Sequence, residues 1–391
     1  MSSAPFLPAP FLRYRQSMTE YPVIPDASMS IFCRIARKVA FDLLRGVSAI
    51  SVVFVHIFEM INLDFKTNPI GHGTLAVDFF FCLSGFVIGY SYDHRIGRIG
   101  AKTFLRNRLI RLHPLVVLGS VLGLLCYLFE PLSNHLQEAG WGKTLSAFFC
   151  SLLMLPFPWL PARGSALFPF NSPAWSLFFE YLVNIMYVFL LIRLHQRWMT
   201  FLLILSAIFL AYACYTGGGL LIGGWNSDNI QVGVPRVTYS FIAGLLVYRY
   251  NLIIKNRLNF LILSLLLAGL LMFPHFDGDW PVTAVLVIGG SPLLVSLGAG
   301  AQITGRLRTV AIFLGRLSYP LYMTHISFVF PLFLIYLSVY KPVGLQLALV
   351  IVGLVCFLIA FAWLAVRFYD EPVRAYLNKK WSKKRDALAA R

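Results

Sequence analysis

The chain has 391 residues, of which 58% are hydrophobic and only 13% are charged, and its mean hydropathy is +0.74. This composition excludes a water-soluble globule and indicates a protein that crosses the membrane several times. The net charge of +17 does not indicate nucleic-acid binding, because the lysines and arginines are concentrated in segments that connect apolar runs, as they are in cytoplasmic loops.

The N-terminal segment is expected to form a tail rather than a signal peptide. The first 40 residues hold several prolines and five basic residues, with no continuous apolar stretch. We therefore expect residues 1–37 to form a cytoplasmic N-terminal tail. Met29, just before the first apolar run, is a candidate translation start.

Eleven apolar segments approach the length of about 20 residues that a helix needs to cross a bilayer. They are residues 41–62, 74–92, 112–129, 144–160, 173–193, 199–216, 235–250, 258–275, 280–300, 312–338 and 345–368. The segment at 144–160 is short and ends in LPFPWLP, whose prolines stop a helix. The predicted fold is therefore an all-α polytopic membrane protein, a bundle of about 10 transmembrane helices with one re-entrant or interfacial segment.

The basic segments predict how the bundle lies in the membrane. The segment RIGRIGAKTFLRNRLIRLH, residues 95–113, is strongly basic, and so is the stretch 377–391, which we expect to be a C-terminal tail. Basic loops stay in the cytoplasm, so both termini are expected there. Two cytoplasmic termini require an even number of crossings. If 144–160 does not cross, every remaining basic cluster also falls on the cytoplasmic side.

Two residues of the first span, Arg45 and His56, are costly to bury in lipid. At about 100° per residue they share one face of a helix, and a rise of about 1.5 Å per residue places them about 16 Å apart. Arg45 can instead extend its guanidinium to the headgroups, and His56 can be a core histidine bonded to a neighbouring hydroxyl. Glu59 follows His56 by one turn and either orients the imidazole or ends the helix in water.

Later segments carry further ionisable residues with two interpretations each. Arg108 and Arg111, on a helix that enters from the cytoplasm, are either topogenic charges or an anchor for phosphate groups. Glu180 in an aromatic helix and Asp78 near the outer end of the second span are either structural ion-pair partners or site residues. His325, in the middle of a late span, is either a packing histidine or a site residue.

Six motifs occur in a characteristic order. They are an arginine and a histidine in the first span, VDFFFCLSGFVIGY, RNRLIRLHP, SPAWSLFFEY, LGRLSYPLYMTHI and FYDEPVR. Together they resemble the membrane acyltransferase family 3, which includes bacterial O-acetyltransferases of lipopolysaccharide, exopolysaccharide and Nod factors. The resemblance covers roughly residues 38–376, which we expect to form the membrane acyltransferase domain. Two motifs depart from the family pattern, because WSLFFE replaces WSLSVE and AVD replaces GVD.

The resemblance implies an enzyme of the bacterial cytoplasmic (inner) membrane. It would move an acyl group, usually acetyl, from cytoplasmic acetyl-CoA or another acyl-CoA to a hydroxyl of a cell-surface or exported glycan. Its expected partners are the lipid bilayer, acyl-CoA and a glycan or lipid-linked sugar, with no nucleic acid. The catalytic residues it implies are His56, Glu180 and Asp78, and the donor-binding residues are Arg45, Arg108, Arg111, Ser84, Tyr322 and His325.

In the expected mechanism, Arg108 and Arg111 hold the CoA phosphates while the pantetheine arm reaches toward His56. His56 acts either as the general base for the acceptor hydroxyl or as an acyl carrier. Glu180 or Asp78 orients the imidazole or binds the acceptor. No metal is expected to take part.

Three alternatives remain at this point. Polar residues at mid-membrane also suit a transporter or flippase for a glycan precursor, although the sequence shows no paired halves with corresponding broken helices. A non-catalytic partner in glycan assembly is a second alternative. A macrolide-type small molecule is an alternative acyl acceptor.

Overall fold

The computed structural model of the chain describes residues 31–62, 67–131, 133–161, 163–301, 303, 305 and 307–389. Residues 1–30 of the expected N-terminal tail and residues 390–391 of the expected C-terminal tail lie outside this part. Within it the regular secondary structure is helical, apart from one isolated bridge between Ala166 and Asn226. The predicted all-α fold is confirmed.

The structure consists of α-helices, and π-helical turns extend or join some of them. The α-helices are α2 (Ile31–Ile61), α3 (Leu75–Tyr92), α4 (Ile96–Leu128), α5 (His135–Leu152), α6 (Ala174–Met186), α7 (Gln196–Thr216), α8 (Ile230–Arg249), α9 (Phe260–Leu271), α10 (Trp280–Val285), α11 (Ser291–Gly300), α12 (Leu307–Thr324), α13 (Ile326–Phe328), α14 (Leu334–Tyr340), α15 (Gly344–Ala365) and α16 (Glu371–Ala389). The π-helical turns are η3 (Tyr187–Leu191), η4 (Leu286–Gly290), η5 (Val329–Phe333) and η6 (Val366–Asp370).

Among the described residues, eight helical segments are long and apolar enough to cross a membrane. They are Arg37–Ile61, Leu75–Tyr92, Ile96–Leu128, Ala174–Leu191, Gln196–Thr216, Ile230–Arg249, Trp280–Gly300 and Gly344–Ser382. A ninth crossing is present if Leu307–Thr324 and Ile326–Tyr340, which are bent by 42° at the break between them, form one span. The protein is a multi-pass membrane protein, as predicted.

Two of the predicted apolar segments form less helix than expected. Only α9, of 12 residues, forms within the expected span 258–275, and about 20 residues are needed to cross a bilayer. The segment 144–160, which was not expected to cross, is helical only as far as Leu152 and then continues as turns.

Two basic segments form more helix than expected. The helix α4 begins at Ile96 rather than near 112, with a kink at Gly100, where the backbone is not helical. The expected C-terminal tail is helical as α16, which continues α15 through η6. Lysine and arginine lower the hydropathy of these segments but are good helix formers. Hydropathy alone therefore underestimates how far α4 and α16 extend along the chain.

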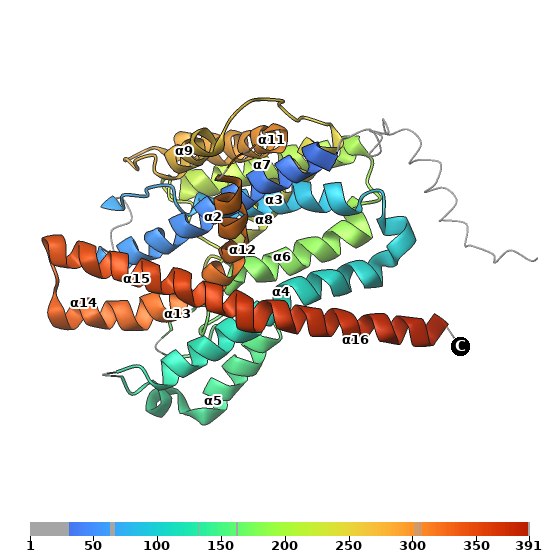
Figure 1. Ribbon diagram of the computed structural model, residues 1–391. Helices are drawn as coiled ribbons and strands as arrows, with labels where there is room; N and C mark the ends of the chain where they lie inside the picture. Colours follow the sequence, from blue (N-terminus) through green and yellow to red (C-terminus); the bar gives the residue numbers. More distant parts are fainter. Residues whose placement is uncertain are drawn as a thin grey trace, which may run out of the picture.

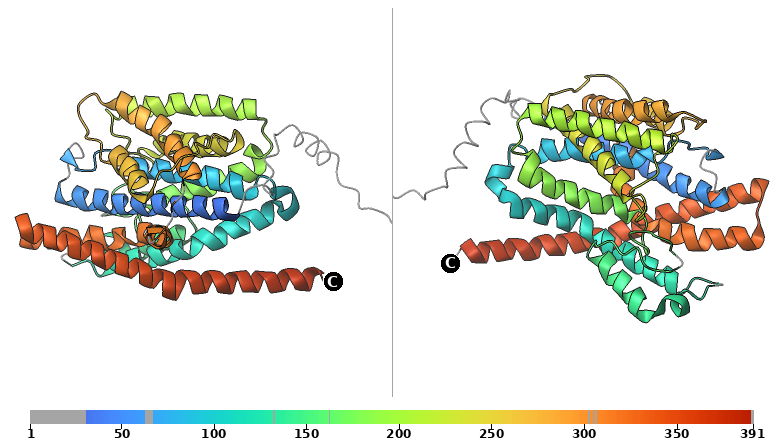
Figure 2. Two further views of the ribbon diagram at one scale, coloured as in Figure 1. Left: turned by 45° about the horizontal axis from the view of Figure 1, so that its top comes forward. Right: turned by 180° about the vertical axis from the view of Figure 1, so that it is seen from behind.

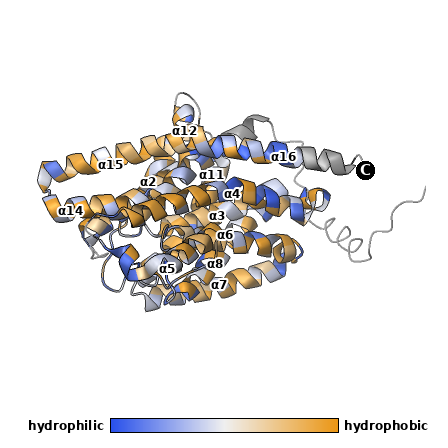
Figure 3. Cartoon of the chain, turned by 90° about the horizontal axis from the view of Figure 1, so that it is seen from below, coloured by the Kyte–Doolittle hydropathy of each residue, from blue (hydrophilic) through white to orange (hydrophobic). Residues whose placement is uncertain are grey.

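The long helices lie side by side, and α12 packs closely against α2 (Figures 1 and 2). Helices α14 and α15 form an antiparallel hairpin, and α16 extends beyond the bundle at the end where α2 begins (Figure 1). Helices α7 and α15 are largely hydrophobic, whereas α16 is hydrophilic (Figure 3). The exposed side chains include Phe201 and Ile208 on α7 and Leu345 and Val352 on α15. Such apolar surfaces are suited to contact with lipid.

Glycines allow α3 and α8 to approach backbone to backbone. A Cβ added to Gly85 of α3 would lie 2.0 Å from the carbonyl oxygen of Phe241, and one added to Gly244 of α8 would lie 1.8 Å from that of Cys82. The close packing of α2 and α12 depends in the same way on Gly46. In lipid, helices associate through such close packing, because no hydrophobic effect drives them together.

The substitution Gly244→Ala is expected to destabilise the protein by about 1–3 kcal/mol, because the added methyl group forces α8 away from α3. Thermal unfolding of the detergent-purified protein measures this loss. The matched control is Gly353→Ala on α15, where an added Cβ meets nothing within 4 Å. Equal melting temperatures for the two variants would contradict the role of this contact.

Candidate active site

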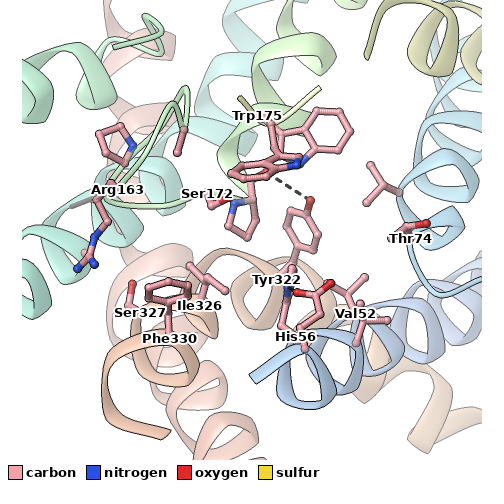
Figure 4. Close-up of a pocket in the computed structure, with 18 of the residues that line it drawn as sticks. Val52, His56, Thr74, Arg163, Ser172, Trp175, Tyr322, Ile326, Ser327 and Phe330 are labelled. Atoms are coloured by element: carbon pink, nitrogen blue, oxygen red, sulfur yellow. Dashed lines mark hydrogen bonds and ion pairs between the residues drawn. The ribbon is translucent and has the colours of Figure 1, made fainter. Parts of the chain in front are cut away.

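A cavity of about 570 Å³ lies inside the bundle, at the end where α2 finishes and α3 begins (Figure 4). We call it the His56 cavity. Its walls come from α2, the start of α3, the second half of α4, the connections before α6 and α8, and α13 with η5. The residues that line it include His56, Glu59, Arg163, Trp175, Arg236, Tyr322 and Ser327. The cavity is mostly apolar with a few polar groups, as binding sites for small molecules commonly are.

His56 is held by a carboxylate of its own helix. The His56 Nδ1 lies 2.7 Å from Glu59 Oε2, and the side chain of His56 is 26% exposed. An ionised carboxylate only accepts hydrogen bonds, so Nδ1 carries the proton and the basic lone pair is on Nε2. This arrangement is the one that a general base requires, with one ring nitrogen oriented by a carboxylate and the other available for reaction.

A second histidine lies against the first. The rings of His56 and His325 are stacked, with centroids 5.3 Å apart. His325 occupies the break between α12 and α13, is fully buried, and its Nδ1 lies 3.0 Å from the carbonyl oxygen of Leu321. Its Nε2 has no hydrogen-bond partner among the described residues.

Tyr322 lies beside His56 and lines the same cavity (Figure 4). Its hydroxyl is 2.8 Å from Ser176 Oγ and donates to the carbonyl oxygen of Pro173 at 3.3 Å. The motif SYPLYMTH therefore brings both Tyr322 and His325 to His56, on the wall where α12 ends.

Glu180 lies at the centre of a different cluster. Arg108 of α4 donates to Glu180 Oε1 at 2.5 Å, and Ser84 of α3 donates to the same oxygen at 2.6 Å. Asn184, one turn further along α6, donates to it at 3.2 Å. The buried ion pair joins α4 to α6, and the hydrogen bond from Ser84 adds α3 to the contact.

Two further arginines belong to the same region. Arg45 pairs with Asp42 one turn earlier on α2, at 3.8 Å. The charge of Arg45 interacts with those of Arg108 and Glu180, and the charge of Arg111 interacts with those of Arg45, Arg108 and Glu180. We call Arg45, Arg108 and Arg111 the arginine cluster.

Asp78 has its own partner, Arg236 of α8. The Arg236 Nη2 lies 2.6 Å from Asp78 Oδ2 and the Nε lies 3.1 Å from Oδ1, with the two side chains 2% and 0% exposed. The remaining guanidinium hydrogens reach the carbonyl oxygens of Gly223 and Thr74, and the guanidinium lies 5.1 Å from the ring centre of Trp175. The pair is bidentate, and its arginine forms part of the cavity wall.

The structure thus divides the residues predicted from the sequence into three groups. His56 and Tyr322 line the cavity, and His325 is stacked on His56. Arg45, Arg108, Arg111, Glu180 and Ser84 belong to the arginine cluster, and Asp78 pairs with Arg236. The carboxylate bonded to the imidazole is Glu59, whereas Glu180 and Asp78 are bonded to arginines.

Arg236 and Asp42 were not predicted as site residues from the sequence. Arg236 lies within the apolar segment 230–249, and an arginine in such a segment needs a polar partner in lipid. Its position alone therefore predicts a buried ion pair. Asp42 lies one turn before Arg45, and this spacing predicts an ion pair between the two side chains along one helix.

Comparison with known proteins connects this site to a family. Residues 38–367 match the sequence profile of the acyltransferase 3 family, which is described as an acyltransferase domain. Protein 2 in the picA locus of Rhizobium radiobacter is 33% identical over 186 residues, which cover 45% of this chain and 94% of that protein. No solved structure matches the chain. Because the matched profile includes His56, the arginine cluster and nearly every membrane helix, this chain belongs to the acyltransferase 3 family of membrane acyltransferases.

Proposed function

We propose that this protein is an acyl-CoA-dependent O-acyltransferase. It takes an acyl group, most simply acetyl, from a CoA thioester in the cytoplasm and delivers it to a hydroxyl of a cell-surface or exported glycan. The observation that carries the proposal is the pair of His56 and Glu59, which places an oriented imidazole in a cavity within the membrane bundle.

The arginine cluster supports CoA as the donor. The phosphate groups of CoA cannot enter lipid, and arginine binds phosphate through charge-assisted, often bidentate hydrogen bonds. Arg45 and His56 lie on one face of α2, and the helical rise over that interval is about 16 Å. An extended pantetheine arm has a comparable length. The nucleotide would then remain at the arginine cluster while the thioester reaches the imidazole.

The orientation in the membrane follows from the same charges. The arginine cluster lies in the N-terminal halves of α2 and α4. The N-terminal ends of both helices are basic, and the basic α16 lies nearer to these halves. Basic segments stay on the cytoplasmic side, so we place this end in the cytoplasm and the His56 cavity toward the outer half of the membrane. Donor and acceptor would then approach the imidazole from opposite sides.

His56 supplies the chemistry in one of two ways. As a general base, Nε2 removes the proton from the acceptor hydroxyl while that oxygen attacks the thioester carbon, and the imidazolium then protonates the leaving CoA thiolate. As an acyl carrier, the imidazole is first acylated by the thioester and then deacylated by the acceptor. In both routes, Glu59 stabilises the positive charge that develops on the ring.

Purified full-length protein in lipid nanodiscs, given labelled acetyl-CoA, tests the proposal. We expect release of free CoA and transfer of label to isolated surface glycans. A transporter would leave the thioester intact. Mass spectrometry of surface glycans from cells with and without the gene identifies the acceptor, and an unchanged acetylation pattern would contradict a glycan acceptor.

The substitution Arg111→Gln is expected to raise KM for acetyl-CoA by about 10- to 100-fold, because it removes one charge-assisted hydrogen bond to phosphate, worth about 1.5–3 kcal/mol. The matched control is Arg98→Gln, which removes an exposed basic residue on the same helix. Steady-state kinetics with S-acetylpantetheine, which lacks the nucleotide phosphates, shows whether the rise in KM comes from the lost phosphate contact or from general damage to donor binding. The assignment fails if Arg111→Gln raises KM equally for both donors.

A further inference from the structure

A buried cluster of two histidines and an aspartate lies apart from the arginine cluster and takes no part in the proposed chemistry. His72 stands in the turn before α3, and His275 and Asp279 stand in the connection between α9 and α10. The side chains of His72, His275 and Asp279 are 2%, 1% and 0% exposed. Residues this polar are rarely buried together unless they bond one another or a ligand.

The spacing of the three side chains suits a metal ion. One ligand atom from each residue lies within 4.8 Å of the other two, and His72 Nε2 is 3.6 Å from Asp279 Oδ2. In a tetrahedral site with bonds of about 2.0–2.2 Å, neighbouring ligand atoms are about 3.3–3.6 Å apart. His72 and Asp279 already have this separation. The Nδ1 of His275 contacts the same Asp279 oxygen more closely, as a hydrogen-bond donor. To bind a metal, Nδ1 would lose this proton, the neutral ring would carry its proton on the unpartnered Nε2, and the ring would move slightly outward.

The hydrogen bonds of His72 leave a lone pair directed into the cluster. The carbonyl oxygen of Phe273 lies 2.8 Å from His72 Nδ1, so Nδ1 carries the proton and Nε2 carries the lone pair. Thr283 Oγ1 is 2.9 Å from this Nε2, but it also donates to the carbonyl oxygen of Gly219 at 2.8 Å. Thr283 has a single hydroxyl hydrogen and can serve only one of these acceptors. A histidine that ligates a metal often donates its other N–H to a backbone carbonyl in this way.

Two buried atoms of the cluster lack partners. Asp279 Oδ1 and His275 Nε2 form no hydrogen bond with any of the described residues. An unsatisfied buried carboxylate oxygen costs free energy that a bound cation would remove. Gly219, whose φ is +93°, lets the backbone pass close to Asp279 Oδ1, because a Cβ at this position would lie 1.7 Å from that oxygen.

We propose that His72, His275 and Asp279 bind one divalent transition-metal ion, with zinc as the best match. Two imidazoles and one carboxylate form a ligand set that zinc uses widely, with a water or Thr283 available for the fourth position. The ion would join the turn before α3 to the connection between α9 and α10. Gly73 and Thr74, which follow His72 directly, line the His56 cavity. The metal would therefore stabilise one wall of that cavity and would not touch the reacting groups.

Metal analysis of the full-length protein tests this proposal. The protein is produced in zinc-supplemented medium with an affinity tag that contains no histidine, then dialysed and analysed by mass spectrometry of its metals. We expect about one zinc per chain in the wild type and none in His72→Ala and His275→Ala. The control His94→Ala removes an exposed histidine outside the cluster and should keep the ion. Wild-type protein without metal, or His72→Ala protein that keeps it, would overturn the proposal.

A second measurement uses only the wild type and decides the question even if the variants do not fold. Metal is removed with a chelator, and Co²⁺ is then added. We expect the visible absorption bands of tetrahedral Co²⁺ and a melting temperature that rises when zinc is returned, since an ion that binds only the folded state stabilises it. If neither the bands nor the rise occurs, the cluster is a hydrogen-bonded group without a metal.

Discussion

Replacing His56 by alanine is expected to slow acyl transfer by about 10²- to 10⁴-fold, the contribution of a positioned general base. The imidazole lines the cavity, is oriented by Glu59 and is stacked on His325, so its loss removes the basic nitrogen and leaves the helix intact. Initial rates of label transfer from acetyl-CoA, measured in nanodiscs, report this loss. The control His94→Ala, at an exposed position outside the site, should transfer at the wild-type rate.

The variant Glu59→Gln tests how the imidazole is oriented. The amide oxygen of glutamine can still accept the hydrogen bond from His56 Nδ1, but it carries no charge to stabilise the imidazolium. We therefore expect an activity between those of the wild type and His56→Ala. If His56→Ala transfers acyl groups at the wild-type rate, the assignment of His56 is wrong.

The two roles of His56 can be separated by rapid quenching with acetyl-CoA in the absence of acceptor. An acyl carrier accumulates an acetyl group on His56, which peptide mass spectrometry detects, and His56→Ala abolishes it. A general base accumulates none, because transfer then occurs in one step with the acceptor.

Most of the fold could be predicted from the sequence, because lipid imposes a simple rule on it. Every backbone polar group within the bilayer must be bonded internally, so long apolar segments become helices whatever their neighbours are. The rule is weakest where charge and apolar surface are mixed. The basic start of α4 around Arg98 and the helical α16 were expected as loop and tail for this reason.

The site could be predicted only in part, because hydropathy and spacing show which residues share a helix and not which helices meet. The contact between His56 and Glu59 lies within one turn and was open to prediction. The partner of Glu180 is 72 positions away at Arg108, and the partner of Asp78 is 158 positions away at Arg236. Nothing in the local pattern around Asp78 distinguishes a carboxylate that serves catalysis from one that serves an ion pair.

Removing one partner of the pair between Asp78 and Arg236 is expected to reduce the stability of the protein by about 3–5 kcal/mol, because a charge is then left unpaired in the interior. Both side chains are almost fully buried, and the guanidinium also bonds two backbone carbonyl oxygens. Thermal and denaturant-induced unfolding of Asp78→Leu and Arg236→Met in detergent measures this loss. The control is Arg316→Gln, since the side chain of Arg316 is 60% exposed and its pair with Glu371 should contribute about 0–1 kcal/mol.

The double variant with Asp78→Leu and Arg236→Met distinguishes a structural pair from a catalytic one. It leaves no unpaired charge, so we expect it to unfold at a higher temperature than either single variant, with a loss smaller than the sum of the two. A catalytic Asp78 predicts a different result, in which Asp78→Asn unfolds like the wild type but transfers no acyl groups. If the losses of stability in the two single variants simply add in the double variant, the two charges are not coupled. The ion pair would then not be the contact that fixes α3 to α8.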